Sequence, residues 1–342
     1  MRPNRYQNAL QHPAAVSPDR LAEQSRPESV SYRNAVLEPA SVADPLWPQA
    51  QAQETAQPTA AAMEGFFTVD VEDWFHILDV GGPQIEEWDA LPSRVEQNFE
   101  RLLDLFSEKK VVTTCFFLGW VAHRFPHLVK EAARRGHEIA SHGYAHRLNY
   151  GLTREQLYQD LLRARLILED AAGTAVSGYR APGFSVVECL FDTLAEAGYR
   201  YDSSIFPAPH GHGGMPGAPL GFHSIQCKNG RTLFEFPITV SSVFGKSVCV
   251  SGGGYMRLFP YWFINRKSRQ VVNEGRPVVF YIHPREIDPN HPRLPMSAYR
   301  GFKSYVNLAA TASKVSRILS DFRVTTFHQY LISHETNGGS KQ

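Results

Sequence analysis

Two histidines four residues apart, His142 and His146, are the residues of this chain best suited to binding a metal. Gly143 lies between them, and a short apolar run at residues 138–140 precedes them. Neutral imidazole nitrogens are good ligands for a borderline metal such as zinc. The glycine and the preceding run argue against a helical HExxH motif. The pair therefore predicts a metal site in a turn that follows a strand.

Other side chains capable of chemistry also stand at the ends of apolar runs. They are Asp70, Glu72 and Asp73 after the run at 65–71, Arg180 after residues 178–179, and His283 after residues 278–282. In parallel α/β folds, ligands bind at the carboxyl ends of the strands. A metal that polarises a carbonyl, a carboxylate that takes a proton and a histidine that donates one are the minimum for amide hydrolysis. The residues therefore favour a metal-dependent hydrolase.

The alternation of strand and helix patterns from Gly65 onward predicts a parallel α/β fold. Expected strands cover about 65–71, 111–117, 138–140, 178–181, 199–202, 278–282 and 323–327, with a strand pair near 232–240. Expected helices begin with capping boxes at Ser93 and Thr153 and also cover about 126–135, 188–197 and 299–319. Residues 207–221, rich in Gly, Pro and His, are expected to form a long loop.

Composition narrows the class of protein and its surroundings. The chain has 342 residues, 43% of them apolar, and a net charge of +1, so nothing points to nucleic acid or an anionic membrane surface. The four cysteines are far apart and fit reduced thiols in a reducing compartment. No apolar run is long enough for a transmembrane segment, and no signal peptide is apparent. We therefore expect a cytoplasmic protein.

The pattern also divides the chain into three parts. Residues 1–62 hold 8 of the 23 prolines and are expected to form a disordered leader. Residues 63–290 are expected to form the catalytic domain, and residues 291–342 a C-terminal extension that packs on it.

The order of these motifs resembles the polysaccharide deacetylases, metal-dependent carbohydrate N-deacetylases with the nodulation-type deacetylase domain (carbohydrate esterase family four). The resemblance spans residues 65–286. The stretches at 68–75 and 281–286 and the C-terminal extension look most like the subgroup that accompanies bacterial exopolysaccharide loci linked to exosortase protein sorting. The resemblance implies a distorted (β/α) barrel of about seven strands.

The resemblance also implies roles for single residues. Asp70 matches the general base that activates the metal-bound water, Arg180 the arginine that pairs with this base, and His283 the general acid. His142 and His146 match two metal ligands. The expected substrate contacts are Gly183, whose N–H would help to hold the oxyanion, together with Phe184 and Tyr144.

The third metal ligand is where this chain departs from the family. The family's acid usually stands next to the base, but Val71 occupies that position. Glu72 is two residues from Asp70 and would face the same side of a strand, whereas Asp73 keeps the usual residue type. Both remain candidates. The cofactor implied is a divalent metal, with zinc the first choice.

The function implied is removal of N-acetyl groups from amino-sugar residues of an N-acetylated polysaccharide, oligosaccharide or precursor. One alternative is an amide hydrolase of the same superfamily that acts on a small amide. The other is a catalytically silent glycan-binding protein that keeps the fold.

Overall fold

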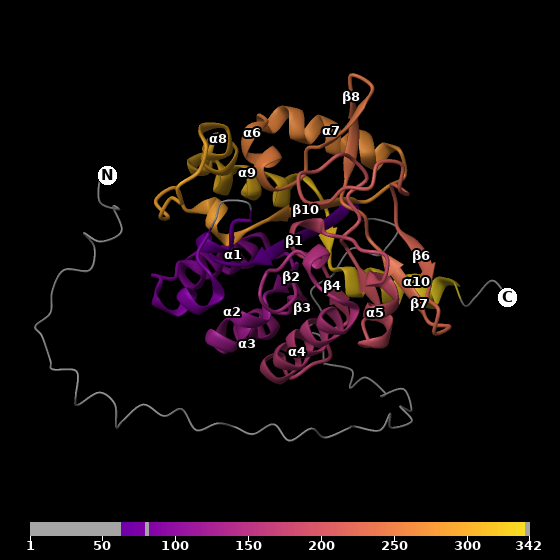
Figure 1. Ribbon diagram of the computed structural model, residues 1–342. Helices are drawn as coiled ribbons and strands as arrows, with labels where there is room; N and C mark the ends of the chain where they lie inside the picture. Colours follow the sequence, from indigo (N-terminus) through magenta and orange to yellow (C-terminus); the bar gives the residue numbers. More distant parts are fainter. Residues whose placement is uncertain (1–62, 79–81, 339–342) are drawn as a thin grey trace, which may run out of the picture. The chain divides into compact units, whose positions relative to one another are not determined.

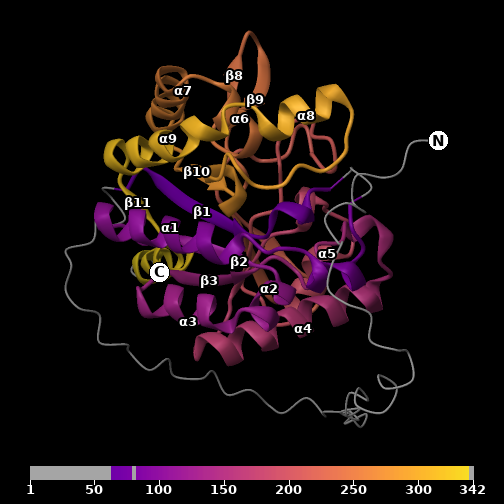
Figure 2. The same ribbon diagram turned by 90° about the vertical axis from the view of Figure 1, so that its left-hand side faces the viewer.

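A computed structural model describes residues 63–78 and 82–338. Its strands and helices alternate along the chain, and the strands form one curled sheet with helices around it (Figures 1 and 2). The expected disordered leader, residues 1–62, lies outside the described residues. No helix among the described residues is long and apolar enough to cross a bilayer.

The main sheet runs in the order β10-β1-β2-β3-β4-β5-β7-β6, and β11 pairs with the start of β1. All neighbours are parallel except β6 and β7, which form an antiparallel pair. The strands are β1 (Gly65–Val71), β2 (Thr114–Phe117), β3 (Glu138–Ser141), β4 (Gly178–Tyr179), β5 (Tyr201–Asp202), β6 (His223–Gln226), β7 (Thr232–Glu235), β10 (Val278–Ile282) and β11 (Val324–Thr325). A separate hairpin joins β8 (Val240–Val243) and β9 (Lys246–Cys249).

The gap between the β7 side of this sheet and β10 is bridged by the segment at residues 236–240. On one side, Phe236 N donates to Asp202 O at 2.9 Å. On the other, Val279 N of β10 donates to Thr239 Oγ1 at 2.8 Å. Single hydrogen bonds, and no strand ladder, therefore connect the two sides, so the barrel stays open here. The result is an incompletely closed half-barrel, which confirms the expected distorted barrel, with eight strands along the curl.

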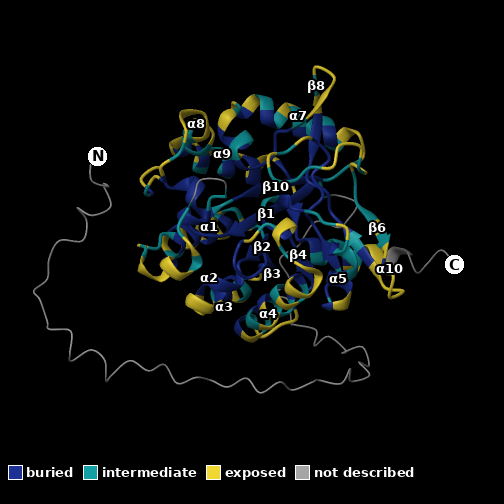
Figure 3. Cartoon of the chain, in the orientation of Figure 1, coloured by how far each residue is buried: buried dark blue, intermediate teal, exposed yellow. Residues whose placement is uncertain are grey.

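Helices surround the sheet, most of them on its outer face. They are α1 (Val95–Lys109), α2 (Gly119–Arg124), α3 (Pro126–Arg134), α4 (Arg154–Ala172), α5 (Leu190–Glu196), α6 (Gly253–Leu258), α7 (Tyr261–Asn273), α8 (Ala298–Tyr305), α9 (Leu308–Asp321) and α10 (Phe327–Gly338). Figure 3 shows the central strands largely buried, the tip of the β8 hairpin exposed, and helices with exposed outer sides.

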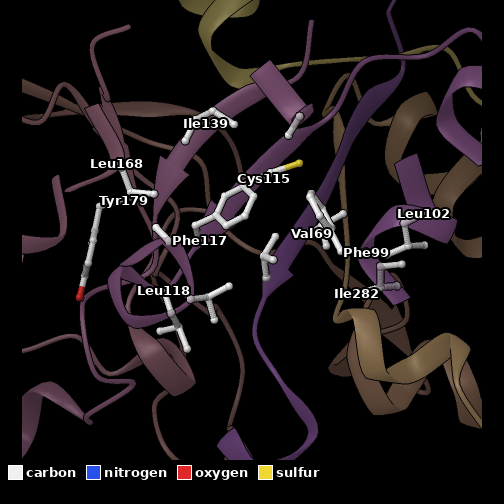
Figure 4. Close-up of a cluster of buried hydrophobic side chains, with 14 of the residues drawn as sticks. Val69, Phe99, Leu102, Cys115, Phe117, Leu118, Ile139, Leu168, Tyr179 and Ile282 are labelled. Carbon is white, nitrogen blue, oxygen red and sulfur yellow. The ribbon is translucent and has the colours of Figure 1, made fainter. Parts of the chain in front are cut away.

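The outer core forms because alternate strand residues point toward the helices. From β1, Val69 and Val71 enter this core, and Phe117 of β2 packs its ring 5.3 Å from that of Phe99 in α1. Figure 4 shows Val69, Phe117 and Ile282 converging with side chains of α1. The intervening residues of each strand must then face the inside of the barrel.

Aromatic rings fill the amino end of the barrel. Phe327, the first residue of α10, is fully buried, and its ring lies 4.2 Å from that of Phe236 and 4.5 Å from that of Phe66. Its backbone N–H donates to Thr114 Oγ1 at 3.2 Å. This end of the barrel is closed, and the residues of the predicted site lie toward the other end.

Two C-terminal elements differ from the sequence prediction. The helix expected at about 299–319 is two helices, α8 and α9, because Asn307 adopts a left-handed conformation with φ of 53°. The strand expected at 323–327 is limited to Val324–Thr325, and Phe327 begins α10, which was not predicted. The helical spacing of residues continues through 299–319. The break between α8 and α9 is therefore visible only in the backbone conformation.

We expect Phe327→Ala to lower the free energy of unfolding by about 3–5 kcal/mol, because it removes a ring buried among several others. Urea unfolding would measure this loss. Trp262→Ala is the matched control, since that ring is 66% exposed on α7 and its removal should change stability by less than about 0.5 kcal/mol. Equal effects of the two substitutions would contradict a structural role for the Phe327 ring at the amino end of the barrel.

Candidate metal centre and active site

The alternation of β1 explains why Glu72, and not its neighbour, faces the site. Val71 lies in the outer core and is fully buried there, whereas Asp70 and Glu72 lie among the residues that line a pocket at the carboxyl end of the barrel. Residues two apart on a strand share a face. The side chain of Val71, next to Asp70, therefore packs against the helices.

Glu72, His142 and His146 form a group that could hold a metal ion. One ligand atom from each lies within 4.8 Å of the others, and all three residues are buried. Glu72 Oε2 is 2.9 Å from His146 Nε2, but the contact lacks hydrogen-bond geometry. His142 Nδ1 is 2.8 Å from Arg180 O. That carbonyl can only accept, so Nδ1 carries the proton and Nε2 keeps its lone pair, as in many metal-binding histidines.

The charges in this group suit a divalent cation. Burial lowers the pKa of His142 to about 4, so its ring is neutral at neutral pH. Burial alone would raise the pKa of Glu72, but His146 and His283 beside it bring that pKa well below its usual range. A neutral imidazole and an ionised carboxylate are the forms that bind metal. The donor set and its protonation therefore fit the implied metal.

Asp73, the other candidate ligand, is engaged elsewhere. Its carboxylate accepts hydrogen bonds from Trp74 N (2.8 Å), Ser93 Oγ (2.6 Å), Arg94 N (3.0 Å) and Val95 N (3.2 Å). It thus satisfies otherwise unpaired amides at the start of α1. The capping box predicted at Ser93 is wrong, because the N-cap is Arg94 and the Ser93 hydroxyl donates to Asp73. The structure brings Glu72, and not Asp73, to the two histidines.

Asp70 is held by a buried ion pair. Arg180 Nη1 donates to Asp70 Oδ1 at 2.6 Å, and both side chains are almost inaccessible to water. The guanidinium also donates to Thr68 Oγ1 at 2.8 Å and to Ser203 Oγ at 3.0 Å, and it lies over the Phe116 ring at 4.2 Å. These contacts fix the orientation of Asp70, whose Oδ2 lies 3.9 Å from His283 Nε2.

Arg180 rests on a second layer of polar residues from β5 and β7. Ala181 N donates to Ser204 Oγ at 2.8 Å, and Ser204 Oγ donates to Asp202 Oδ1 at 2.6 Å. Asp202 and Glu235 are both fully buried. Burial raises both pKa values, that of Glu235 well above its usual range. Sequence reasoning missed this layer, because no local motif marks it.

His283 is oriented by a residue three positions later. Its Nδ1 lies 3.5 Å from Glu286 Oε2, and Glu286 Oε1 accepts a hydrogen bond from Arg257 Nη1 at 2.5 Å. Burial alone would lower the pKa of His283, but Glu72 and Glu286 raise it above its usual value. His283 can therefore carry a proton near neutral pH. The three-residue spacing between His283 and Glu286 was a signal in the sequence that could have identified this partner.

These residues surround a pocket of about 190 Å³. Gly183 and Phe184 line it, as expected for substrate contacts. Gly183 has φ of 59°, which favours glycine. Tyr144 lies outside the pocket lining, because its ring packs against Gly119 and lies 3.5 Å from the Arg163 guanidinium.

Two family models match adjacent parts of the chain. Residues 87–201 match the polysaccharide deacetylase model, and residues 203–332 match a model described as "Domain of unknown function (DUF3473)". Among curated proteins, Helicobacter pylori peptidoglycan deacetylase is 31% identical over 110 residues, which cover 32% of this chain and 38% of that protein. A Bacillus cereus peptidoglycan-N-acetylglucosamine deacetylase is 32% identical over 100 residues, covering 29% and 46%. The matches span less than half the length of either relative.

One solved structure supports the same fold. A crystal structure of a candidate polysaccharide deacetylase from Mycobacterium smegmatis matches with a TM-score of 0.54 and 23% identity, covering 81% of this chain and 91% of that one. It shows the α/β half-barrel. At this identity the similarity shows the fold alone, and the match to the polysaccharide deacetylase model is limited to residues 87–201.

The site residues come from both matched segments and from the stretch that precedes them. His142, His146 and Arg180 lie within the deacetylase match, whereas Asp70 and Glu72 precede it. His283 lies within the segment whose model carries no function. The pocket therefore depends on both segments.

Metal binding distinguishes the two acidic candidates. We expect Glu72→Ala to weaken zinc binding by more than about 100-fold, because loss of even an outer-shell partner costs about 10- to 100-fold. Asp73→Asn should keep the metal but destabilise the fold by about 1 kcal/mol through loss of the cap. Calorimetric zinc titration and thermal unfolding would measure the two effects. Loss of zinc in Asp73→Asn together with retention in Glu72→Ala would contradict the assignment.

Proposed function

We propose that this chain is a metal-dependent N-deacetylase that acts on amino-sugar residues of a glycan. The observation that supports this most is the convergence of Asp70, the Glu72–His142–His146 group and His283 in one pocket. The names of the matched relatives, peptidoglycan deacetylase and peptidoglycan-N-acetylglucosamine deacetylase, point to the same bond.

In this proposal, Glu72, His142 and His146 hold a divalent metal, with zinc the first choice for two imidazoles and a carboxylate. The ion would polarise the acetyl carbonyl and lower the pKa of a coordinated water to about 7. The other groups of the reaction are supplied by the chain itself.

Asp70 acts as the general base. It takes a proton from the water whose oxygen attacks the acetyl carbon. Arg180 donates to Oδ1 at 2.6 Å and leaves Oδ2 facing the pocket side occupied by His283. Gly183 and Phe184 contact the acetyl group and sugar in this proposal, whereas Tyr144 has no part in it.

His283 acts as the general acid. An amine anion cannot leave in water, so the nitrogen must receive a proton as the C–N bond breaks. The raised pKa of His283 keeps this proton available, and Glu286 holds the ring. The products are acetate and a sugar with a free amine.

We also propose a wider setting for this activity. Residues 63–290 form the catalytic domain, and residues 291–342 an extension, whose α9 and β11 contact η7 (Pro284–Ile287) and β1.

The four free cysteines favour a reducing compartment, hence the cytoplasm. The substrate is a precursor of a bacterial exopolysaccharide from an exosortase-linked locus. Cell fractionation would test the compartment. A comparison of exopolysaccharide N-acetylation between the parent and a deletion strain would test the substrate.

Acetate release from N-acetylglucosamine oligomers tests the activity. We expect Asp70→Asn and His283→Ala each to lower kcat by about 10²- to 10⁴-fold, the usual contribution of a positioned acid or base. His127→Ala is the control, because that histidine is exposed on the surface. A chelator should abolish turnover, and zinc should restore it. Unchanged acetate release in both site variants would contradict the mechanism.

The pH profile tests the role of Glu286. A general acid works only while protonated, so kcat/KM should fall as pH rises through the pKa of His283. Glu286 raises that pKa. Glu286→Gln should therefore lower it and move the alkaline limb of the profile to lower pH. Glu274→Gln, at an exposed site, should leave the profile unchanged. An unmoved or upward-shifted limb in Glu286→Gln would contradict the proposed effect of Glu286 on His283.

A further inference from the structure

The near-zero net charge of the chain conceals an uneven distribution. Residues 241–320 contain twelve Lys and Arg but three Asp and Glu, a net charge of +9; since the whole chain carries +1, the rest carries −8. Each of the three acids in this stretch is paired with an arginine: Glu274 with Arg276, Glu286 with Arg257 and Asp288 with Arg94. A strong charge asymmetry within one chain indicates a partner of opposite charge.

The exposed aromatic side chains gather in the same stretch. Among the described residues, four of the five exposed aromatic side chains lie between residues 244 and 302: Phe244, Trp262, Tyr299 and Phe302. Each is followed within four positions by an exposed cation, in the same order Lys246, Arg266, Arg300 and Lys303. The β8–β9 hairpin, α7 and α8, which carry these eight residues, contain no acidic residue. We call the exposed side of these three elements the basic aromatic face.

The three elements lie on the same side of the molecule. Figures 1 and 2 show the β8–β9 hairpin beside α7 and α8 from two directions, with the hairpin tip projecting beyond α7 in both. Lys267 Nζ of α7 donates to Ser242 O of β8 at 2.6 Å, which holds the hairpin against the helix. Trp262 and Arg266 are one helical turn apart and share the exposed side of α7. Helix α8 has no buried residue at all.

Phe244 stands at the hairpin tip in a conformation that its side chain disfavours. It is fully exposed, and with Gly245 it forms the two-residue turn between the paired residues Val243 and Lys246. The φ angles of 49° and 76° place both turn residues in the left-handed region, as in a type I′ turn. Asn-Gly is a preferred pair in such turns, and a bulky residue is rare there. Folding alone therefore does not explain an aromatic ring at this tip, whereas its burial in a partner would.

An anionic bilayer surface matches this combination of side chains. Aromatic rings are favoured at the boundary between lipid headgroups and acyl chains, and each Lys or Arg near an anionic surface contributes about 1 kcal/mol of attraction. A projecting ring can enter lipid without a complementary pocket. A second copy of the chain that used the same face would bring two positively charged surfaces together, which disfavours self-association here.

We propose that the basic aromatic face docks the protein on an anionic lipid bilayer. The ring of Phe244 enters the boundary between headgroups and acyl chains, and the exposed cations of the hairpin, α7 and α8 lie against the headgroups. This docking does not depend on the deacetylase activity, so the two proposals can fail separately.

The test is co-sedimentation of the full chain with lipid vesicles. Vesicles of equal parts phosphatidylcholine and phosphatidylglycerol should bind the chain at least about 10-fold more tightly than vesicles of phosphatidylcholine alone, and added salt should weaken this binding. Phe244→Asn should weaken binding to the anionic vesicles by about 10-fold, because the variant cannot bury a ring in lipid. Arg266→Gln should weaken it by about 5-fold through loss of one cation.

Phe244→Asn also separates docking from folding. It creates Asn-Gly in the hairpin turn, so its Tm should equal or exceed that of the unmodified chain. Tyr150→Asn is the control, since Tyr150 is an exposed aromatic residue of η5 (Asn149–Gly151), outside the basic aromatic face, and this variant should bind vesicles as the unmodified chain does.

Three results would overturn the proposal. The first is an absence of binding to anionic vesicles, as expected if the face binds an acidic protein or a nucleic acid instead. The second is equal binding to the two kinds of vesicle. The third is unchanged binding in Phe244→Asn, or a fall in its Tm together with its binding, which would assign the ring to the fold.

Discussion

The buried guanidinium of Arg180 is the contact on which the rest of the site depends. A charge without access to water must be paired, and here Asp70 pairs with it at 2.6 Å. The backbone carbonyl of the same residue accepts from His142 Nδ1 at 2.8 Å. One residue after β4 therefore sets both the orientation of a carboxylate on β1 and the tautomer of a histidine after β3. The barrel must bring these strand ends together for that charge to be buried at all.

The two ends of the barrel are stabilised by different interactions, apolar packing at one end and paired polar groups at the other. At the amino end, Phe327 and the rings around it exclude water and stabilise the curl. At the carboxyl end, buried polar groups are paired in layers, from the Asp202–Glu235 pair beneath Arg180 to the Arg257–Glu286 pair behind His283. Loss of one partner in such a layer leaves a buried charge uncompensated, which is why the positioning residues matter as much as those that face the pocket.

Much of this arrangement follows from local sequence. The apolar run before each polar residue marks a strand, and period-two alternation then turns Asp70 and Glu72 to the same face. The choice between Glu72 and Asp73 could not be completed in the same way. Asp73 caps a helix that begins some twenty residues later, and only the fold shows that its oxygens are already occupied. Tyr144, predicted as a substrate contact, has its ring beside Arg163 and outside the pocket lining, a placement that the sequence of the turn did not indicate. Contacts between distant segments, such as Arg180 with Ser203, leave no pattern in the sequence.

The most direct test of a metal site at Glu72, His142 and His146 is anomalous diffraction at the zinc edge from crystals grown with zinc and acetate. We expect one strong anomalous peak from an ion bound by Glu72, His142 and His146, with acetate in the pocket between this peak and Gly183. A peak bound through Asp73, or no peak at the histidine pair at saturating zinc, would contradict it.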